Sequence, residues 1–180
     1  MKKVLLLLSF LYATVHVVAV QEYNVKNIGI REGLSNGYVV DICMDGQGFV
    51  WAATEHGLDR IAGNKCTVFG TSNSHISNNE HVGVLYHKKT NSVWIHSKDG
   101  RVDVFDCNRQ RIEPFLIGKE NMVSVADITL AADSGIWLAH YHGDIRHYDP
   151  ATKQFSFISK KNFPQIRNGV RSITDDGKGN

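Results

Sequence analysis

The stretch that decides the fold is "DGQGFVWAATEHGLDRIAG", which runs from Asp45 to Gly63. A glycine-rich turn precedes a short apolar run around Trp51, and a second turn at Glu55-His56-Gly57 precedes another apolar run. Short apolar runs between tight turns predict two antiparallel strands. An isolated hairpin is barely stable in water, so these strands need a further surface to pack against.

An internal repeat supplies that surface. The chain of 180 residues has only three tryptophans, they recur at a constant interval of 43 residues, and each is followed six residues later by a glycine. These repeat positions are Trp51, Trp94 and Trp137, with Gly57, Gly100 and Gly143. An apolar run and a turn precede each tryptophan, and a strand-like run follows each glycine, so one structural unit is repeated.

Each repeat is predicted to hold four short strands. The expected strands are 39–44, 49–53, 58–62 and 67–69 in the first repeat, 82–86, 93–96, 101–105 and 112–116 in the second, and 125–130, 136–139, 144–148 and 155–158 in the third. A four-stranded unit that recurs every 40-odd residues is the pattern of a β-propeller blade. The sequence therefore predicts an all-β fold with blades at about 33–72, 73–118 and 119–162.

A fourth blade is expected only in part, within residues 163–180. The final residues "ITDDGKGN" repeat "ICMDGQGF" of the first unit, which predicts the first strand of a further blade. With three complete blades and one strand of a fourth, the ring is expected to be incomplete, and the chain is interpreted as a fragment.

The first nineteen residues have the layout of a secretory signal peptide. Met1-Lys2-Lys3 is a basic start, the run 4–20 is almost wholly apolar, and small residues precede the polar Gln21. We expect cleavage after Ala19 and export of residues 20–180 as a partial propeller domain. A retained membrane anchor is the alternative, although the run is short for a membrane span and contains His16.

Charge and cysteine content exclude several classes of protein. Without Lys2 and Lys3 the chain has 18 basic and 18 acidic residues, so nucleic acid is not expected as a partner. Three cysteines are too few and odd in number for a disulfide framework. Cys43 lies in an apolar run and is expected to be a small buried hydrophobe. A disulfide between Cys66 and Cys107 is the less favoured alternative.

No catalytic or metal-binding motif stands out. There is no nucleophile elbow, P-loop or dinucleotide-binding glycine pattern, so neither enzymatic activity nor a cofactor is expected. His140 and His142 lack partners at zinc-like spacing, and the aspartates near Asp45 lack the alternating ligands of a calcium hand. The tryptophans are expected to pack in the core, with sugar-stacking platforms as the alternative.

The segments that link the repeats carry their own signature. They are "GLSNGYV" (33–39), "HISNNEHV" (75–82) and "QIRNGV" (165–170). The residues after the tryptophans are Ala52, Ile95 and Leu138 rather than Asp, which excludes WD40 repeats. With "GLSN" at 33–36, Asp45-Gly46 before Trp51, and Gly57-Leu58 after it, the chain resembles the two-component regulator propeller repeats.

That resemblance implies a place in signalling. The family is best known as the periplasmic sensor region of Bacteroidetes hybrid histidine kinases, where ligands are typically oligosaccharides derived from glycans. The implied partners are such an oligosaccharide and the remaining blades and signalling domains of a full-length receptor, and a homodimer is left open. The segment itself is not expected to be an enzyme, since a kinase core is not among these residues. The alternatives are a streptogramin-lyase-like propeller enzyme and a truncated product without a function.

Strand parity localises the expected binding site. In an antiparallel four-stranded meander, the blade-linking segments and the loops between second and third strands lie on one face, which we call the shared face. Its amides, imidazoles and aromatic ring suit hydroxyl-rich sugars. The expected ligand-binding residues are Asn36, His56, Asn79, Lys98, Asp99, His140, Tyr141 and His142, and Glu55 and Asn168 lie on the same face. The alternative is an ordinary solvated rim.

Overall fold

Short antiparallel strands make up about half of the described chain. The computed structural model describes residues 25–117, 120–121, 125–158 and 169–178. Blade 1 contains β1 (Val39–Met44), β2 (Val50–Thr54), β3 (Leu58–Ala62) and β4 (Lys65–Phe69). Blade 2 contains β5 (His81–His87), β6 (Ser92–Ser97), β7 (Val102–Asp106) and β8 (Arg111–Pro114). Blade 3 contains β11 (Val125–Leu130), β12 (Ile136–His140), β13 (Ile145–Asp149) and β14 (Gln154–Ile158).

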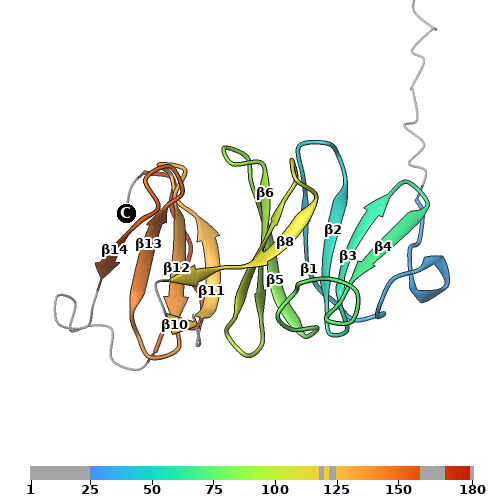
Figure 1. The fold of residues 1–180 in the computed structure, drawn as a ribbon, viewed down its shortest axis with the longest axis horizontal. Coiled ribbons are helices and arrows are strands. Elements are labelled where there is room, and N and C mark those ends of the chain that lie inside the picture. The colour runs from blue at the N-terminus through green and yellow to red at the C-terminus, as the bar shows by residue number, and fades with distance from the viewer. Residues whose placement is uncertain (1–24, 118–119, 122–124, 159–168, 179–180) are drawn as a thin grey trace, which may run out of the picture.

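The three blades are separate four-stranded sheets with the strands in chain order. Figure 1 shows them side by side in an open row rather than in a closed ring. The smaller elements are a 3-10 helix, η1 (Ile30–Glu32), before blade 1 and a two-stranded pair, β9 (Leu116–Ile117) and β10 (Glu120–Asn121), between blades 2 and 3. The predicted all-β propeller fold is confirmed, and each of the twelve blade strands begins and ends within two residues of its expected position.

The expected first strand of a fourth blade is not a strand. Residues 169–178 contain no strand, but this segment is fixed to blade 3. The carboxylate of Asp127 accepts hydrogen bonds from the Ser172 hydroxyl at 2.8 Å and from the Ile173 amide at 2.9 Å. The described residues provide no second strand with which this segment could form a ladder. The predicted signal peptide lies outside the described residues.

The strand registers define equivalent positions in the three blades. Each first strand has a register shift near its start, at the same place relative to the second strand, as a β-bulge produces. Trp51, Trp94 and Trp137 each lie directly opposite one residue of the third strand. These opposing residues are Arg60 in blade 1, Val104 in blade 2 and His147 in blade 3.

The apolar core lies between the blades. One cluster joins the Trp51 side of blade 1 to blade 2, and a second joins the Trp94 side of blade 2 to blade 3. Trp51 is fully buried and Trp94 is 3% exposed, so the prediction of core packing is confirmed for both. Trp137, on the outer side of blade 3, is only half-buried.

Blade-linking segments are attached to the third strands by serine–aspartate pairs. The Asp59 carboxylate accepts the Ser35 amide at 3.0 Å and its hydroxyl at 2.6 Å, and Asp103 accepts the Ser77 amide at 3.0 Å and its hydroxyl at 2.7 Å. Burial raises the pKa of both carboxyl groups, and the serine hydrogen bonds oppose that shift. A side chain at Gly57 would lie 3.1 Å from the Ser35 hydroxyl, which explains why glycine occupies this repeat position.

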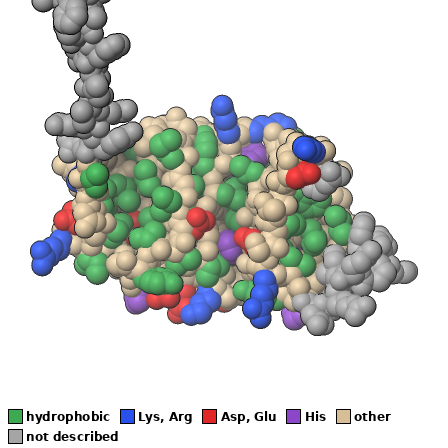
Figure 2. Space-filling view, turned by 180° about the vertical axis from the view of Figure 1, so that it is seen from behind, with side chains coloured by type: hydrophobic (Ala, Val, Ile, Leu, Met, Phe, Trp, Pro, Cys, Tyr) green, Lys and Arg blue, Asp and Glu red, His purple; other side chains and the backbone are tan. Residues whose placement is uncertain are grey.

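The outer side of blade 1 exposes apolar side chains. Ile42 and Met44 of β1 are 62% and 63% exposed, and Val40 on the same side of the strand is 40% exposed. Figure 2 shows hydrophobic side chains gathered over the blade 1 part of the molecule. An uncovered apolar strand of this kind favours association with another surface.

Candidate functional site

A polar pocket opens on the predicted shared face, between blades 1 and 2. It has a volume of about 380 Å³, and we call it the rim pocket. Its lining residues are Glu55, His56, Asn78, Asn79, Glu80 and Lys98. They come from the β2–β3 loop, the segment that links blades 1 and 2, and the β6–β7 loop. The structure therefore brings together four of the residues that strand parity had placed on this face: Glu55, His56, Asn79 and Lys98.

The β2–β3 loop is fixed by hydrogen bonds at its base. The Thr54 hydroxyl donates to the Gly57 carbonyl at 2.8 Å and accepts the His56 amide at 3.1 Å. The Asn36 side-chain amide lies 2.6 Å from Nδ1 of His56, so these two predicted residues contact each other. The imidazole at the pocket edge is thereby held by the segment that precedes blade 1.

The linking segment is fixed in a similar way. The Asn79 carbonyl oxygen accepts the Thr71 amide at 2.8 Å, and the Asn79 amide donates to the Thr71 hydroxyl at 3.3 Å. The Lys98 amide donates to the Glu80 carbonyl at 2.9 Å, and the Lys98 ammonium lies 3.0 Å from the Glu80 carboxylate. The hydrogen bond to Glu80 raises the pKa of Lys98, and the negative charges of Glu80 and Glu55 act in the same direction. Both signs of charge are therefore present in the pocket.

The remaining predicted residues do not line the rim pocket. The Asp99 carboxylate lies 3.3 Å from the Arg101 guanidinium. Tyr141 is 49% exposed and His142 is exposed, both in the β12–β13 loop of blade 3. His140 departs from the expectation of a loop residue, because it ends β12 and is buried. Asn168 lies outside the described residues.

Burial decides the protonation of His140. Burial, and next the positive charge of Arg146, lowers the pKa of His140 to about 4. Its Nε2 atom is buried without a hydrogen-bond partner. The His140 imidazole is therefore buried and neutral at neutral pH.

Asn78 and Glu80 were not predicted as site residues. They flank Asn79 in the linking segment "HISNNEHV", so the signal was their place beside a predicted residue. The serine–aspartate pairs were also missed. Their signal was a serine directly after an apolar residue in two linking segments, Leu34-Ser35 and Ile76-Ser77, together with an aspartate in the third strand of the same two blades.

The described residues offer little for catalysis or metal binding. No group of three or more His, Cys, Asp or Glu side chains is placed to hold a metal ion in the described ranges. All three cysteines are free, so the alternative disulfide between Cys66 and Cys107 is not formed. Burial raises the pKa of Cys43 to about 12 and that of Cys107 to about 11. Neither is therefore a thiolate nucleophile at neutral pH.

Comparisons with known proteins agree with the repeat and the fold. Residues 33–56 match the family model of the two component regulator propeller. The chain is similar to the extracellular domain of BT3049 from B. thetaiotaomicron, described as a hybrid two component system. That similarity has 27% identity and a TM-score of 0.70, and covers 80% of this chain and 21% of that one. A search of curated proteins found no significant match.

Two further structures share the fold alone. The extracellular domain of BT4673 from B. thetaiotaomicron, described as a one component system, has 17% identity and a TM-score of 0.62, and the match covers 83% of this chain and 19% of that one. Virginiamycin B lyase from Staphylococcus aureus has 12% identity and a TM-score of 0.52, and that match covers 68% of this chain and 41% of the lyase.

This chain is an all-β propeller segment whose residues 33–56 match the two component regulator propeller family, and this match confirms the resemblance seen in the sequence. It spans about a fifth of the length of the BT3049 domain, of which it covers 21%. The two B. thetaiotaomicron relatives are extracellular domains. No helix within the described residues is long and apolar enough to cross a membrane.

Proposed function

We propose that this chain is the ligand-sensing propeller segment of an exported two-component sensor, and that it binds an oligosaccharide derived from a glycan on its shared face. The relative with 27% identity is an extracellular domain of a two component system, which supports a sensing rather than an enzymatic role. Binding would be passed on to signalling domains of a full-length receptor, including a histidine kinase.

The rim pocket is the observation that carries this proposal. All six of its lining side chains can form hydrogen bonds, and they provide amide, imidazole, carboxylate and ammonium groups within about 380 Å³. A hydroxyl-rich ligand can both donate to the carboxylates and accept from Lys98 and the amides. An apolar ligand would displace water from these groups without offering them hydrogen bonds in return, which costs free energy.

The proposal is tested by binding of oligosaccharides to the purified chain. A panel of plant and host oligosaccharides is screened, and the affinity of the best ligand is then measured by calorimetry. Replacing Lys98 by Met or Asn79 by Ala should weaken binding by about tenfold, because each removes a polar partner from the pocket. Lys89→Met is the matched control, since Lys89 is an exposed lysine of the β5–β6 turn on the opposite face.

Two results would contradict the proposal. One is that no oligosaccharide of the panel binds. The other is that Lys98→Met and Lys89→Met have equal affinities. Tyr141→Ala and His142→Ala extend the test to blade 3: reduced affinity would mean that the ligand reaches across the shared face to that loop.

Export is part of the same proposal. The basic start and the apolar run of residues 4–20 support a signal peptide of residues 1–19, followed by the propeller segment of residues 20–180. N-terminal sequencing of the protein from the periplasm should give a first residue near Val20. A retained Met1 would contradict it.

A further inference from the structure

The same aromatic trio occurs at both interfaces between blades. Trp51 packs with Phe69 and Phe105 at ring-centre distances of 5.7 and 4.6 Å between blades 1 and 2. Between blades 2 and 3, Trp94 packs with Phe115 and Tyr148 at 4.5 and 5.7 Å. The strand registers make the two trios equivalent, because Phe105 and Tyr148 each pair with the residue that precedes the tryptophan of their own blade.

At the first interface, an arginine covers the trio. The Arg60 guanidinium lies 5.6 Å from the Trp51 ring centre, 5.7 Å from that of Phe69 and 5.8 Å from that of Phe105. Its Nη1 atom donates a hydrogen bond to the side-chain carbonyl of Gln110. A cation over aromatic faces is stabilising, so this site is filled from within the chain.

At the second interface, both residues of this cover are replaced. Val104 occupies the register position of Arg60 and cannot reach over the trio. Lys153 is the counterpart of Gln110: each lies five residues after its aromatic partner, with a φ of 58° for Lys153 and 53° for Gln110. In addition, Ser92 stands where Phe49 stands in blade 1, two residues before the tryptophan.

The smaller side chains leave an open cleft, which we call the interblade cleft. It has a volume of about 320 Å³, within the range of small-molecule sites. Its aromatic wall consists of Trp94, Phe115 and Tyr148, with Val104 beside it. The cleft lies at the β5–β6, β7–β8 and β13–β14 turns, at the opposite ends of the strands from the rim pocket.

The charged side chains of the cleft favour a negatively charged ligand. Arg111 pairs with Glu113 at 2.9 Å and Arg109 with Asp106 at 3.6 Å. The Lys153 ammonium has no ion-pair partner among the described residues. Within the described chain, the cleft therefore has one positive charge without an ion-pair partner, on Lys153. In the first interface the equivalent residue is Gln110, whose side-chain carbonyl accepts a hydrogen bond from Arg60.

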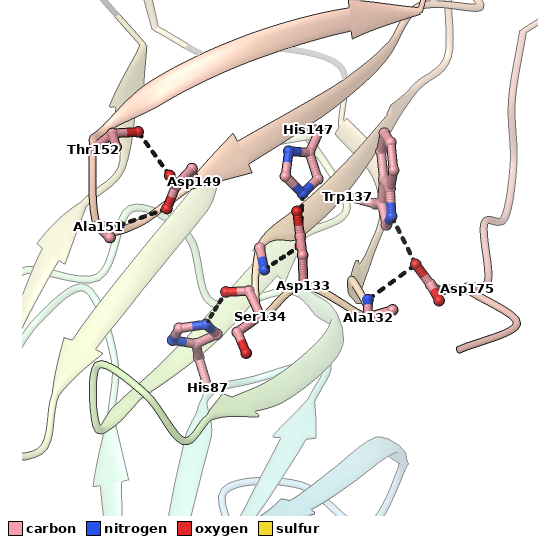
Figure 3. A network of polar contacts seen from close by, with 11 residues as sticks. His87, Ala132, Asp133, Ser134, Trp137, His147, Asp149, Ala151, Thr152 and Asp175 are labelled. Carbon is pink, nitrogen blue, oxygen red and sulfur yellow. Dashed lines mark hydrogen bonds and ion pairs between the residues drawn. The ribbon is translucent and has the colours of Figure 1, made fainter. Parts of the chain in front are cut away.

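Three further features prepare the cleft for a ligand. The Tyr148 side chain is 92% buried by the aromatic trio and its neighbours, yet its hydroxyl has no hydrogen-bond partner among the described residues. Asp149 accepts the Ala151 amide and the Thr152 hydroxyl, each at 2.8 Å, and so fixes the turn that carries Lys153 (Figure 3). The Trp94 indole is oriented by its hydrogen bond to Ser92 at 3.1 Å.

We propose that the interblade cleft binds a sugar acid, with its carboxylate on Lys153 and its ring against Phe115 and Tyr148. The exchange of a guanidinium–carbonyl pair for a valine and an ammonium without an ion-pair partner in the described ranges opens the site and leaves its positive charge available to a ligand. The Tyr148 hydroxyl and the rim of paired charges provide hydrogen bonds for ring hydroxyl groups. This site is separate from the rim pocket and does not depend on the proposed sensing role.

The test uses D-glucuronate as the probe, D-glucose as its uncharged control, and the full 180-residue chain. Saturation-transfer NMR detects binding from the ligand side, and calorimetry gives the affinity. Glucuronate should bind, glucose should bind at least tenfold more weakly, and Lys153→Gln should remove most of the difference between them. The double variant Val104→Arg/Lys153→Gln rebuilds the first interface, so it should abolish glucuronate binding while its melting temperature stays equal or rises.

A control variant shows that the effect is specific to Lys153. Lys65→Met should leave glucuronate affinity unchanged, since Lys65 is an exposed lysine of β4 that lines neither the interblade cleft nor the rim pocket. Lys153→Gln changes only an exposed turn side chain, so it is expected to fold even if the double variant does not, and circular dichroism verifies this. Absence of glucuronate binding, equal affinity for glucose, or unchanged affinity in Lys153→Gln would each overturn the proposal.

Discussion

Equivalent tryptophans in different surroundings should differ in their contribution to stability. Trp51 is fully buried, packs with Phe69 and Phe105, and donates its Nε1 hydrogen to Asp45 at 2.8 Å. Trp51→Ala should therefore lower the free energy of unfolding by about 3–5 kcal/mol, as for other large core aromatics. Trp137→Ala, at a half-buried position, should cost clearly less. Chemical denaturation measures both, and equal losses would mean that Trp51 is not a core residue.

Buried histidines should make the fold sensitive to acid. Burial is the largest cause that lowers the pKa of His81, and also that of His140, to about 4 in the folded chain. Because both values are depressed, each histidine contributes stability that is complete above the unfolded pKa of 6.5 and is lost as the pH falls through 4.

The variant His140→Gln isolates this effect, since glutamine stays neutral at every pH. Between pH 7.5 and pH 4.5, the wild type should lose stability relative to the variant. Its free energy of unfolding should fall by on the order of 1–3 kcal/mol more than that of His140→Gln. Denaturant titrations at the two pH values measure it. A difference that is constant with pH would show that His140 is accessible to protons in the folded chain.

Residue spacing predicted the repeat positions well and the buried polar contacts poorly. The tryptophans and glycines were recognisable because a constant interval is visible in the sequence alone. His140 seemed to be a loop residue because it follows a short apolar run, but β12 extends by one residue and buries it. The Ser35–Asp59 and Ser77–Asp103 pairs join residues 24 and 26 positions apart, and only the register of the blades brings them together.

At the scale of elements, the linking segments should stabilise the blades through their serines. The Ser77 hydroxyl donates to Asp103, which is fully buried. In Ser77→Ala, the Asp103 carboxylate loses the hydroxyl donor and keeps the backbone amide of residue 77. The free energy of unfolding should therefore fall by about 1–3 kcal/mol. Ser156→Ala, on the exposed face of β14, is the matched control and should change stability by less than about 0.5 kcal/mol.

Thermal and denaturant unfolding of both variants tests this prediction. If Ser77→Ala proved as stable as Ser156→Ala, the linking segment would not be anchored by Asp103. The third blade offers no equivalent pair, because Arg146 stands at the position of Asp59 and Asp103.

Strand positions could be predicted closely because each strand is an apolar run bounded by turn residues. The β9–β10 pair and the path of residues 169–178 could not, because neither follows the repeat. Residues 169–178 repeat the sequence of β1, yet they form no strand ladder. Hydrogen bonds to Asp127, Ala132, Trp137 and the His140 carbonyl fix this segment instead. Sequence similarity gives the preference for a strand, whereas a partner strand is needed to form one. His87, which bonds the Ser134 carbonyl at 2.8 Å, likewise joins blades 2 and 3 through a contact that the repeat does not predict (Figure 3).

At the scale of the whole molecule, the outer side of blade 1 should cause self-association. Ile42 and Met44 are more than 60% exposed on an uncovered strand, at 62% and 63%. Replacing both by Thr keeps the preference for a strand and removes apolar surface, so the sedimentation coefficient should fall toward that of a monomer. Tyr141→Ser, an exposed substitution on the shared face, should leave association unchanged. Identical sedimentation of the wild type and the double variant would contradict this role of β1.

The location of the candidate site was predictable at this scale, whereas its detailed composition was not. Strand parity alone placed Glu55, His56, Asn79 and Lys98 on one face, and the structure brings them into the rim pocket. Parity could not show that Asp99 pairs with Arg101 or that the interblade cleft opens on the other face. The interblade cleft opens because Val104 is smaller than Arg60 at the equivalent position. This equivalence can be recognised only when the strand register is known.

The most direct test of the account is hydrogen–deuterium exchange of the chain with and without the best-binding oligosaccharide of the panel. The account predicts slower exchange in the segments that carry Glu55 and His56, Asn78 to Glu80, and Lys98. The turns at 45–48 and 88–91, on the opposite face, should exchange at unchanged rates. Protection of those turns with no change at the rim pocket would contradict the claim that the shared face binds the ligand.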